Sequence, residues 1–289
     1  MIYVIGGPTG TGKTTLALEL AKVWKAPIVN ADAFQMYQGM DIGTNKDKAR
    51  LKNFQTYFFD HVSPQEGMTV ARYQKEVRAL LLELLPKHPK IILVGGTGLY
   101  IKASLFNFHF ADHETEPDLT AFETMDNLKL HQCLSEFDHQ AATKIHPQNR
   151  RRVLRAIAIH LATGRTKTEQ EGVQMKEPLF PCRIVAIQAE KKTLNQDLDQ
   201  RVLDMFAKGL VKEVQALKDK FGDKIHAFQA IGYKETLRYL NGEETLDKTI
   251  QTIQTATRRY AKRQITYFRH QLPTQWFPDW QTALKDLTS

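Results

Sequence analysis

Residues 2–16 read IYVIGGPTGTGKTTL, and this stretch decides the fold. An apolar run at 2–5 leads into GPTGTGKT at 7–14, and a helical pattern of apolar residues begins at Leu16. A G-x-x-x-x-G-K-[ST] pattern between a strand and a helix is the setting that a phosphate-binding loop requires. The glycines let backbone N–H groups turn toward a phosphate chain, and the helix N-terminus adds partial positive charge. A chance glycine-rich turn is the alternative, and the flanking strand and helix argue against it.

Two side chains give this loop its chemistry. The Lys13 ammonium adds a full positive charge, and the Thr14 hydroxyl is a ligand for Mg²⁺ beside phosphate oxygens. We therefore expect a di- or triphosphate site, with Mg²⁺ held by Thr14 through the phosphates. The residues of this predicted site are Gly7, Pro8, Thr9, Gly10, Thr11, Gly12, Lys13 and Thr14.

Composition narrows the class of protein. A chain of 289 residues is long enough for one large core or two lobes. It has no apolar run near the roughly 18 residues that span a bilayer, and no basic leader precedes the first strand, so we expect a cytoplasmic protein without membrane contact. Cys133 and Cys182 lie in no metal-binding pattern, which indicates reduced thiols and no zinc.

The charge is unevenly distributed along the chain. The net charge is +8, an excess that a small-metabolite kinase does not need and a polyanionic partner would explain. Residues 139–168 contain seven Lys and Arg and no acid, and residues 250–278 contain five and no acid. Such stretches favour contacts to a phosphate backbone. Solvated helix faces are the alternative.

Apolar runs that alternate with helical patterns predict the fold class: an α/β protein with a P-loop NTPase-like parallel sheet flanked by helices. Ligands of such sheets bind at the carboxyl ends of the strands, so the loop at 7–14 and the glycine turn at 95–98 should face one crevice. The predicted strands are 2–5, 27–29, 57–59, 90–94 and 183–188, and the helices between them are 14–24, 69–85 and 99–106.

The middle of the chain changes character. Helical stretches at 128–143 and 150–163 are interrupted by no β-branched run. We predict a catalytic core formed by residues 1–106 and 182–289, with a small helical insertion domain at 107–181. Helical patterns at 194–221, 230–240 and 246–271 predict that the core ends in helices.

The predicted strand at 90–94 ends in GGTG at 95–98, where ordinary P-loop NTPases have an Asp that helps to hold Mg²⁺. The missing carboxylate weighs against simple ATP hydrolysis. The second glycine turn, with the Thr97 hydroxyl, suits further phosphate oxygens instead. Thr97 as a helix N-cap is the alternative, and the two roles can coexist.

Asp32 lies just past the predicted strand at 27–29. Because a bound pyrophosphate repels a nearby carboxylate, a role as general base for a nucleophile would explain its presence. Helix capping is the alternative. Gln35 has an amide that can pair with an adenine edge, with an ordinary surface amide as the alternative.

A basic ridge runs along the last predicted helix. Arg258 and Lys262, like Arg259 and Arg263, stand four residues apart, with Tyr260 among them. Aromatic rings among cations suit contacts to RNA. They suit equally a helix that packs its aromatic side on the sheet.

Several ordered motifs together resemble the tRNA dimethylallyltransferases, also called tRNA isopentenyltransferases, over nearly the whole chain. The combination of GGTGLY with TRRYAKRQ is highly specific for this family, whereas the phosphate-binding loop motif alone is common to many proteins. The motifs are GGPTGTGKT at 6–14, ADAFQ at 31–35, YQGMDIGT at 37–44, VGGTGLY at 94–100, HP at 146–147 with the arginines to 155, GL at 209–210 with EV at 213–214, IGYKE at 231–235 and TRRYAKRQ at 257–264.

The resemblance implies transfer of the dimethylallyl group of dimethylallyl diphosphate to N6 of the adenosine 3′-adjacent to the anticodon of tRNA. Asp32 would be the general base, with Thr97 and Lys13 at the reacting centre. Arg201 would join the loop in holding the diphosphate, with Mg²⁺ assisting. With the basic ridge, the expected contacts to the tRNA anticodon stem-loop are Asp32, Ala33, Phe34, Gln35, Thr97, Arg151, Arg152, Arg155, Arg258, Arg259, Lys262 and Arg263. We expect a monomer.

The chain departs from the family's usual residues in places, and its insertion is shorter than typical. We expect activity because the residues assigned to chemistry are intact, while rate and tRNA range stay open. The departures are Asn30, Ala33, Phe34, Asn149, Ala158 and Asp197.

Three other functions stay open at this point. An adenylate isopentenyltransferase needs no tRNA surface, so the basic insertion argues against it. A P-loop nucleoside or nucleotide kinase is disfavoured by the missing strand-end Asp. Lys13 and Asp32 argue against a catalytically impaired tRNA-binding protein.

Overall fold

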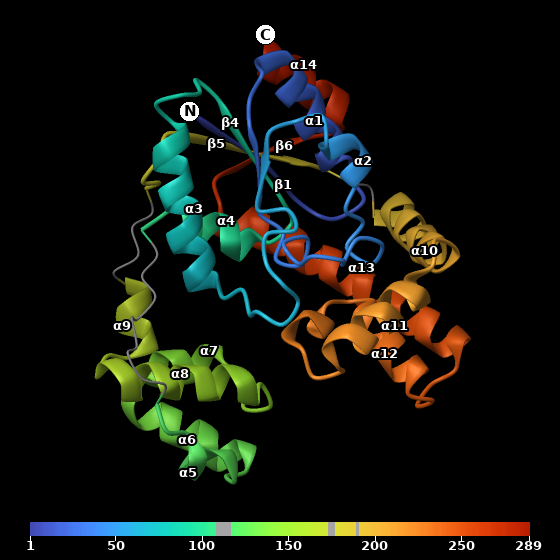
Figure 1. The fold of residues 1–289 in the computed structure, drawn as a ribbon. Helices are drawn as coiled ribbons and strands as arrows, with labels where there is room; N and C mark the ends of the chain where they lie inside the picture. Colours follow the sequence, from blue (N-terminus) through green and yellow to red (C-terminus); the bar gives the residue numbers. More distant parts are fainter. Residues whose placement is uncertain (108–116, 173–176, 189–190) are drawn as a thin grey trace. The chain divides into compact units, whose positions relative to one another are not determined.

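The computed structural model describes residues 1–107, 117–172, 177–188 and 191–289 (Figure 1). Contacts divide the chain into two compact units. The sheet unit consists of Met1–Leu105 and Phe180–Ser289, and the helical unit consists of Phe106–Leu179.

The sheet unit is built on six parallel strands in the order β3-β2-β4-β1-β5-β6, which confirms the predicted parallel α/β sheet. The central strand β1 pairs with β4 and β5, so that Ile5 stands between Val94 and Val185. Helices cover both faces, which is why the central strands are almost continuously apolar. The strands are β1 Ile2–Gly6, β2 Ile28–Asn30, β3 Thr56–Tyr57, β4 Ile91–Val94, β5 Cys182–Ile187 and β6 Thr274–Phe277.

Side chains that alternate along β1 face two different layers of helices. Ile5 packs in one core with Leu16 of α1 (Lys13–Trp24) and Leu287 of α14 (Trp280–Thr288). Gly6 faces α13 (Leu246–Gln271), where an added Cβ would lie 2.1 Å from a ring carbon of Phe268. The glycine therefore lets the long helix α13 approach the end of the central strand.

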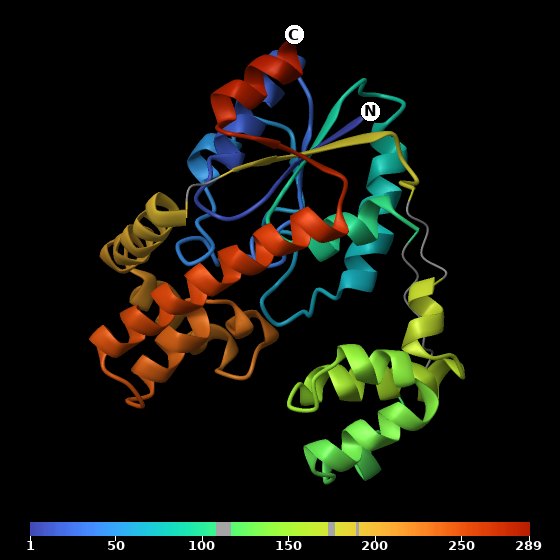
Figure 2. The ribbon, with the colours of Figure 1, turned by 180° about the vertical axis from the view of Figure 1, so that it is seen from behind.

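The remaining helices of the sheet unit surround this frame. Helix α3 packs against α4, and α13 packs against α4, α10 and α12 (Figure 2). No helix among the described residues is both long and apolar enough to cross a bilayer. The elements are α2 Lys48–Leu51, α3 Val70–Leu84, α4 Gly98–Leu105, α10 Lys191–Ala207, α11 Leu210–Phe221, the 3₁₀ helix η1 His226–Gln229 and α12 Tyr233–Leu240.

The helical unit has its own small core of leucine, isoleucine, valine and alanine side chains, including Leu130, Leu134 and Val153. Asp138 organises it: its Oδ1 caps α7 through Ala141 N–H at 3.0 Å, and both carboxylate oxygens accept hydrogen bonds from Thr168. The helices are α5 Thr120–Glu123, α6 Asn127–Phe137, α7 His139–Lys144, α8 Arg150–Thr163 and α9 Lys167–Gly172.

Several predicted boundaries were wrong. The pattern at 194–221 is two helices, α10 and α11, because Gly209 adopts φ 100° between them. The pattern at 128–143 is likewise two helices, which meet at Asp138. The predicted strand at 57–59 ends at Tyr57, since Phe58 has φ 63°. The sequence also missed β6, an edge strand whose residues are largely half-buried or exposed instead of continuously apolar.

Candidate active site

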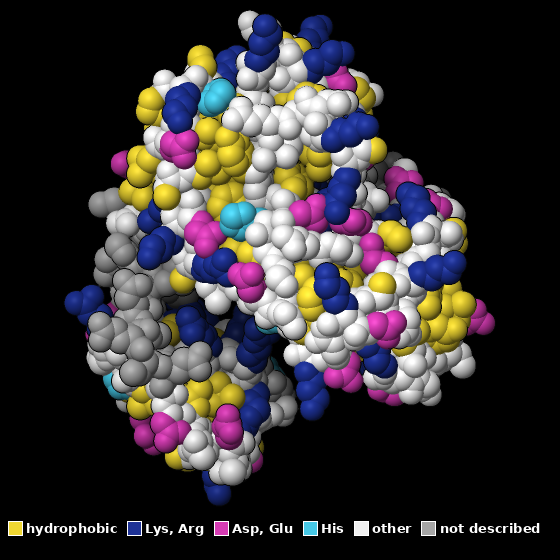
Figure 3. Space-filling model, viewed as in Figure 1, with side chains coloured by type: hydrophobic (Ala, Val, Ile, Leu, Met, Phe, Trp, Pro, Cys, Tyr) yellow, Lys and Arg dark blue, Asp and Glu magenta, His cyan; other side chains and the backbone are white. Residues whose placement is uncertain are grey.

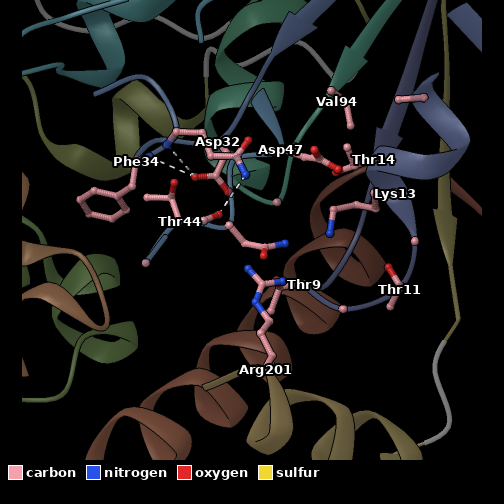
Figure 4. Close-up of a pocket in the computed structure, with 18 of the residues that line it drawn as sticks. Thr9, Thr11, Lys13, Thr14, Asp32, Phe34, Thr44, Asp47, Val94 and Arg201 are labelled. Atoms are coloured by element: carbon pink, nitrogen blue, oxygen red, sulfur yellow. Dashed lines mark hydrogen bonds between the residues drawn. The ribbon is translucent and has the colours of Figure 1, made fainter. Parts of the chain in front are cut away.

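The carboxyl ends of β1, β2 and β4 open into one cavity of about 360 Å³, drawn in Figure 4. The loop at 7–14 follows β1, residues 31–35 follow β2, and the glycine turn at 95–98 follows β4, so the predicted shared crevice is confirmed. Helices α10 and α13 and the chain before α12 contribute further lining residues: Arg201, Met205, Ala230, Ile231, Ile253, Thr257, Tyr260 and Gln264.

The loop at 7–14 has the backbone that its glycines allow. The backbone φ values of Gly7, Gly10 and Gly12 are 109°, 85° and 84°. These lie in a region that residues with a Cβ rarely adopt. Gly12 is the N-cap of α1, so the unbonded amides at the helix N-terminus lie at the end of the loop. Their partial positive charge favours an anion there.

Lys13 is half-buried in this loop, and its ammonium donates a hydrogen bond to the carbonyl oxygen of Pro8. Burial lowers the pKa of Lys13 from 10.5 to about 7; the Asp32 carboxylate opposes this shift and the Arg201 guanidinium adds to it. Lys13 and Arg201 thus line the cavity together with the carboxylate of Asp32, and Arg50 and Asp47 line it as well.

Arg201 enters the same cavity from α10 (Figure 4). Burial lowers the pKa of its guanidinium, and only the Asp32 charge opposes that effect. Its Nε is buried and has no hydrogen-bond partner among the described residues. Because a buried N–H group of a guanidinium without a hydrogen-bond partner is costly, this arrangement favours an incoming anion.

Asp32 is held in a turn at the end of β2. Its Oδ1 accepts the N–H of Phe34 at 3.0 Å and of Gln35 at 3.4 Å, so the carboxylate does cap a turn. Its Oδ2 makes no hydrogen bond to the described residues. Asn30 supports the turn: its amide bonds the Asp32 backbone and the carbonyl oxygen of Phe58.

Thr97 is half-buried and is not among the residues that line the cavity. Its Oγ1 accepts the N–H of Ala33 at 3.1 Å, whereas α4 begins at the next residue. The hydroxyl therefore joins the 95–98 turn to the residue after Asp32, and is not bonded to an amide of α4. Ala33 also stands outside the lining, while Phe34 and Gln35 line it.

The side-chain amide of Gln35 forms one hydrogen bond within the protein. Its Nε2 donates to the carbonyl oxygen of Thr44 at 3.0 Å, whereas its Oε1 has no hydrogen-bond partner among the described residues. Thr44 belongs to a loop that the sequence analysis did not connect with the site.

That loop is fastened by Glu213 of α11. Its carboxylate accepts the N–H groups of Asp41, Ile42 and Gly43 at 3.0, 2.8 and 3.2 Å. The Tyr233 hydroxyl donates to the same carboxylate at 2.6 Å. The motifs at 37–44, 213–214 and 231–235, far apart in sequence, are thus one structural assembly.

Two residues of α13 belong to the site and were missed as site residues. Gln264 accepts the N–H of Thr9 at 3.1 Å and donates to the carbonyl oxygen of Gly96 at 2.9 Å. Burial raises the pKa of Tyr260; the charge of Asp32 raises it further, and contacts with Thr97 and Gln264 oppose the rise. Their spacing of four on the buried side of a basic helix was the available signal.

The basic ridge of α13 divides into two kinds of side chain. Arg259, Lys262 and Arg263 are exposed. Arg258 is half-buried and forms an ion pair with Asp199 of α10, so an acid from another element faces this acid-free stretch. On the face drawn in Figure 3, basic and acidic side chains are interspersed over the sheet unit.

In the helical unit, α8 presents Arg151, Arg152 and Arg155 as exposed side chains. They form no ion pair with a described residue. Arg150 differs, because its guanidinium donates to the carbonyl oxygens of Phe122, Glu123 and Met125, which makes it a structural residue.

The remaining departures from the family pattern are Asn149, Ala158 and Asp197. Asn149 precedes α8 as its N-cap without a side-chain hydrogen bond, and Ala158 is buried in the same helix. Asp197 is an exposed residue of α10. None of them lines the cavity.

Comparison with known proteins gives a consistent match. The family model described as IPP transferase matches residues 35–271. A tRNA dimethylallyltransferase of Geobacillus thermodenitrificans is 37% identical over 284 residues, which cover 96% of this chain and 90% of that protein.

Two solved structures share the fold. The tRNA delta(2)-isopentenylpyrophosphate transferase of Staphylococcus epidermidis has a TM-score of 0.73 and 32% identity, covering 99% of this chain and 97% of that one. A eukaryotic dimethylallyltransferase acting on tRNA has a TM-score of 0.82 and 27% identity, covering 95% of this chain and 73% of that one.

Proposed function

The chain belongs to the IPP transferase family, and we propose that it transfers the dimethylallyl group of dimethylallyl diphosphate to N6 of the adenosine 3′-adjacent to the anticodon of tRNA, releasing pyrophosphate. One observation carries the proposal: a single cavity combines a glycine loop and the half-buried cations Lys13 and Arg201 with the carboxylate of Asp32. The cations suit a diphosphate, and the carboxylate suits a nucleophile that must lose a proton.

The reaction exchanges one bond for another. The lone pair of N6 forms a bond to C1 of the allyl group, while the C1–O bond breaks and its electron pair leaves with pyrophosphate. Negative charge therefore grows on the leaving oxygens. Lys13, Arg201 and the amides of the loop would stabilise that charge, because they are fixed before the reaction starts.

Asp32 would take the proton that N6 loses. Its Oδ1 is held by the amides of Phe34 and Gln35, which leaves Oδ2 for the amine. An adenine amine is a weak nucleophile, so alignment with C1 matters more than the strength of the base. Thr97, through its bond to Ala33, would keep the Asp32 turn in place.

Mg²⁺ fits this site as a partner of the diphosphate. Thr14 stands in the first turn of α1, where its hydroxyl can join phosphate oxygens around the ion. The described residues contain no group of three His, Cys, Asp or Glu that would form an all-protein site. Mg²⁺ commonly binds through substrate phosphates with few protein ligands, and it would neutralise the leaving group.

The tRNA is expected to meet both basic regions. Exposed arginines of α8 and the exposed part of the α13 ridge would bind backbone phosphates, while Phe34 and Gln35 would contact the target base. Because the base must reach a buried carbon, it has to leave its stack. We also propose that the chain acts as a monomer in the cytoplasm, where its RNA substrate is found.

The test offers labelled dimethylallyl diphosphate and Mg²⁺ to the protein with tRNA, with AMP, or with no acceptor. We expect label in tRNA alone, and none in tRNA whose target adenosine is replaced by guanosine. Label in AMP would favour an adenylate isopentenyltransferase instead. Salt-sensitive tRNA binding without any transfer would indicate a catalytically impaired tRNA-binding protein.

A further inference from the structure

The side-chain amide of Gln264 connects two loops that are far from it in sequence. Thr9 is 255 residues away and Gly96 is 168 residues away, yet both bond the same amide, which is only 5% exposed. The oxygen accepts one hydrogen bond while the nitrogen donates the other. Among side chains of this length, an uncharged primary amide is the group that does both.

Gly96 is shaped to receive this amide. A Cβ at that position would lie 2.1 Å from Nε2 of Gln264, and it would be 3.6 Å from the carbonyl oxygen of Gly7. Gly96 has no positive φ, so backbone conformation does not demand a glycine there. The close approach of the amide does.

The two loops that Gln264 connects lie at different ends of the cavity, one at the diphosphate end and one beside Asp32. Thr9 belongs to the loop that receives the diphosphate. Gly96 precedes Thr97, whose N–H donates to the carbonyl oxygen of Ala31 at 3.3 Å and whose Oγ1 accepts the N–H of Ala33. Ala31 and Ala33 flank Asp32, so the contacts run without a gap from the diphosphate loop to the base.

The sheet sets the spacing of these loops only up to the ends of the strands. The last backbone bond between the two segments joins Gly95 N–H to the carbonyl oxygen of Ile5 at 3.2 Å. Beyond it, in the described parts of the chain, the hydrogen bonds that connect residues 7–14 with 95–98 pass through Gln264.

We propose that Gln264 is a positioning residue, which fixes the diphosphate loop relative to the turn that holds Asp32 and so aligns C1 with the attacking amine. The inference rests on the proposed function and names a residue that determines its rate. Each substrate binds mainly to its own end of the cavity. Losing the bridge should therefore slow the transfer step more than it weakens the binding of either substrate.

The test measures the single-turnover rate at saturating substrates and, separately, the Kd of dimethylallyl diphosphate and of tRNA. Gln264→Met keeps length and removes both hydrogen bonds. We expect a rate about 10²-fold lower, the usual cost of a misplacement near 1 Å, with each Kd within about threefold of wild type. Gln251→Met is the control, since Gln251 is exposed on the same helix.

Two further variants disrupt the contact between the Gln264 amide and Gly96 in other ways. Gln264→Glu keeps the acceptor for Thr9 but loses the donor to Gly96 and adds a negative charge, so it should weaken diphosphate binding as well as the rate. Gly96→Ala displaces the amide from the other side. The double variant Gly96→Ala with Gln264→Met should be no slower than the slower of the two single variants. Both substitutions break the same contact, so their effects should not add.

The outcomes separate this inference from the proposed function. A wild-type protein that transfers nothing overturns both. If the wild type transfers and Gln264→Met is equally fast, or loses only diphosphate affinity, the positioning role alone is wrong. The positioning role would also be wrong if the rate losses of Gln264→Met and Gly96→Ala multiplied in the double variant. Should circular dichroism show that Gln264→Met is unfolded, Gly96→Ala decides by the same criterion, a slower rate with each Kd nearly unchanged.

Discussion

The two oxygens of the Asp32 carboxylate have different environments. Oδ1 accepts two backbone N–H groups of its own turn, and Oδ2 makes no bond to a described residue. A carboxylate that both caps a turn and serves as a base cannot be tested cleanly by truncation, because alanine removes both roles. Asparagine keeps an acceptor for the turn and loses the basic oxygen.

We therefore expect Asp32→Asn to slow transfer by about 10²–10⁴, the usual contribution of a general base, with tRNA affinity nearly unchanged. Single-turnover rates and filter binding of tRNA measure the two quantities. Asp32→Ala should be slower still, since the turn is also lost. Turnover of Asp32→Asn close to wild type would remove Asp32 from the role of base.

Lys13 makes diphosphate binding depend on pH. Burial, with Arg201 adding to it and Asp32 opposing it, lowers the pKa of Lys13 to about 7. In the free protein the ammonium is present below that pH and is lost as the pH rises through it. A bound diphosphate favours the ammonium, so above about pH 7 binding must take up a proton, which weakens affinity by up to about tenfold per pH unit.

Calorimetry in two buffers with different ionisation enthalpies counts that proton. At pH 8 we expect uptake approaching one proton in the wild type and less in Lys13→Arg, whose guanidinium stays charged. The difference between the two proteins corrects for titration of the diphosphate itself. Equal proton uptake by both would contradict the shifted pKa.

At the scale of elements, the loop at 41–44 depends on a neighbour that no local pattern reveals. Glu213 binds three of its amides, and Tyr233 packs directly against Gly43. An added Cβ at Gly43 would lie 2.3 Å from a ring carbon of Tyr233. The glycine allows α12 to close over the loop.

Gly43→Ala should therefore lower the free energy of unfolding by about 1–3 kcal/mol, the usual cost of overpacking. Gly67→Ala is the matched control, because a Cβ there meets nothing within 4 Å, and it should change stability by less than about 0.5 kcal/mol. Urea denaturation measures both. Equal stability of the two variants would show that the Tyr233 ring yields without cost.

Elements with strong periodicity were predictable. The periodicity predicts a helix at 246–271, and α13 has these bounds. Elements set by one residue's backbone were not: Gly209 and Asp138 each divide a continuous apolar pattern into two helices. Periodicity reports which face is buried, and it continues undisturbed across a short break in the axis.

At the scale of the whole molecule, the basic charge serves more than one purpose. Arg151, Arg152 and Arg155 are exposed on α8, whereas Arg150 holds the carbonyl groups at the end of α5 and just beyond it. A charge count cannot distinguish these roles. The structure does so through the partners of each guanidinium.

Replacing Arg151, Arg152 and Arg155 with Gln should weaken tRNA binding and reduce the slope of log K against log salt by about one for each lost phosphate contact. The Kd of dimethylallyl diphosphate should not change, because its site belongs to the sheet unit. Arg150→Gln should instead lower the melting temperature. An unchanged salt slope in the triple variant would exclude α8 from the RNA surface.

The phosphate-binding loop, the parallel sheet and the family could all be predicted from the amino-acid sequence, because each rests on residues that are neighbours along the chain. Strand, glycine loop and helix follow one another within 2–16, and the motifs are short. The tertiary structure decided which groups meet in the cavity. The family resemblance implied Arg201 beside the loop, whereas no local pattern indicated that Gln264 joins Thr9 to Gly96. Those contacts arise only when packing brings α10 and α13 to the ends of the strands.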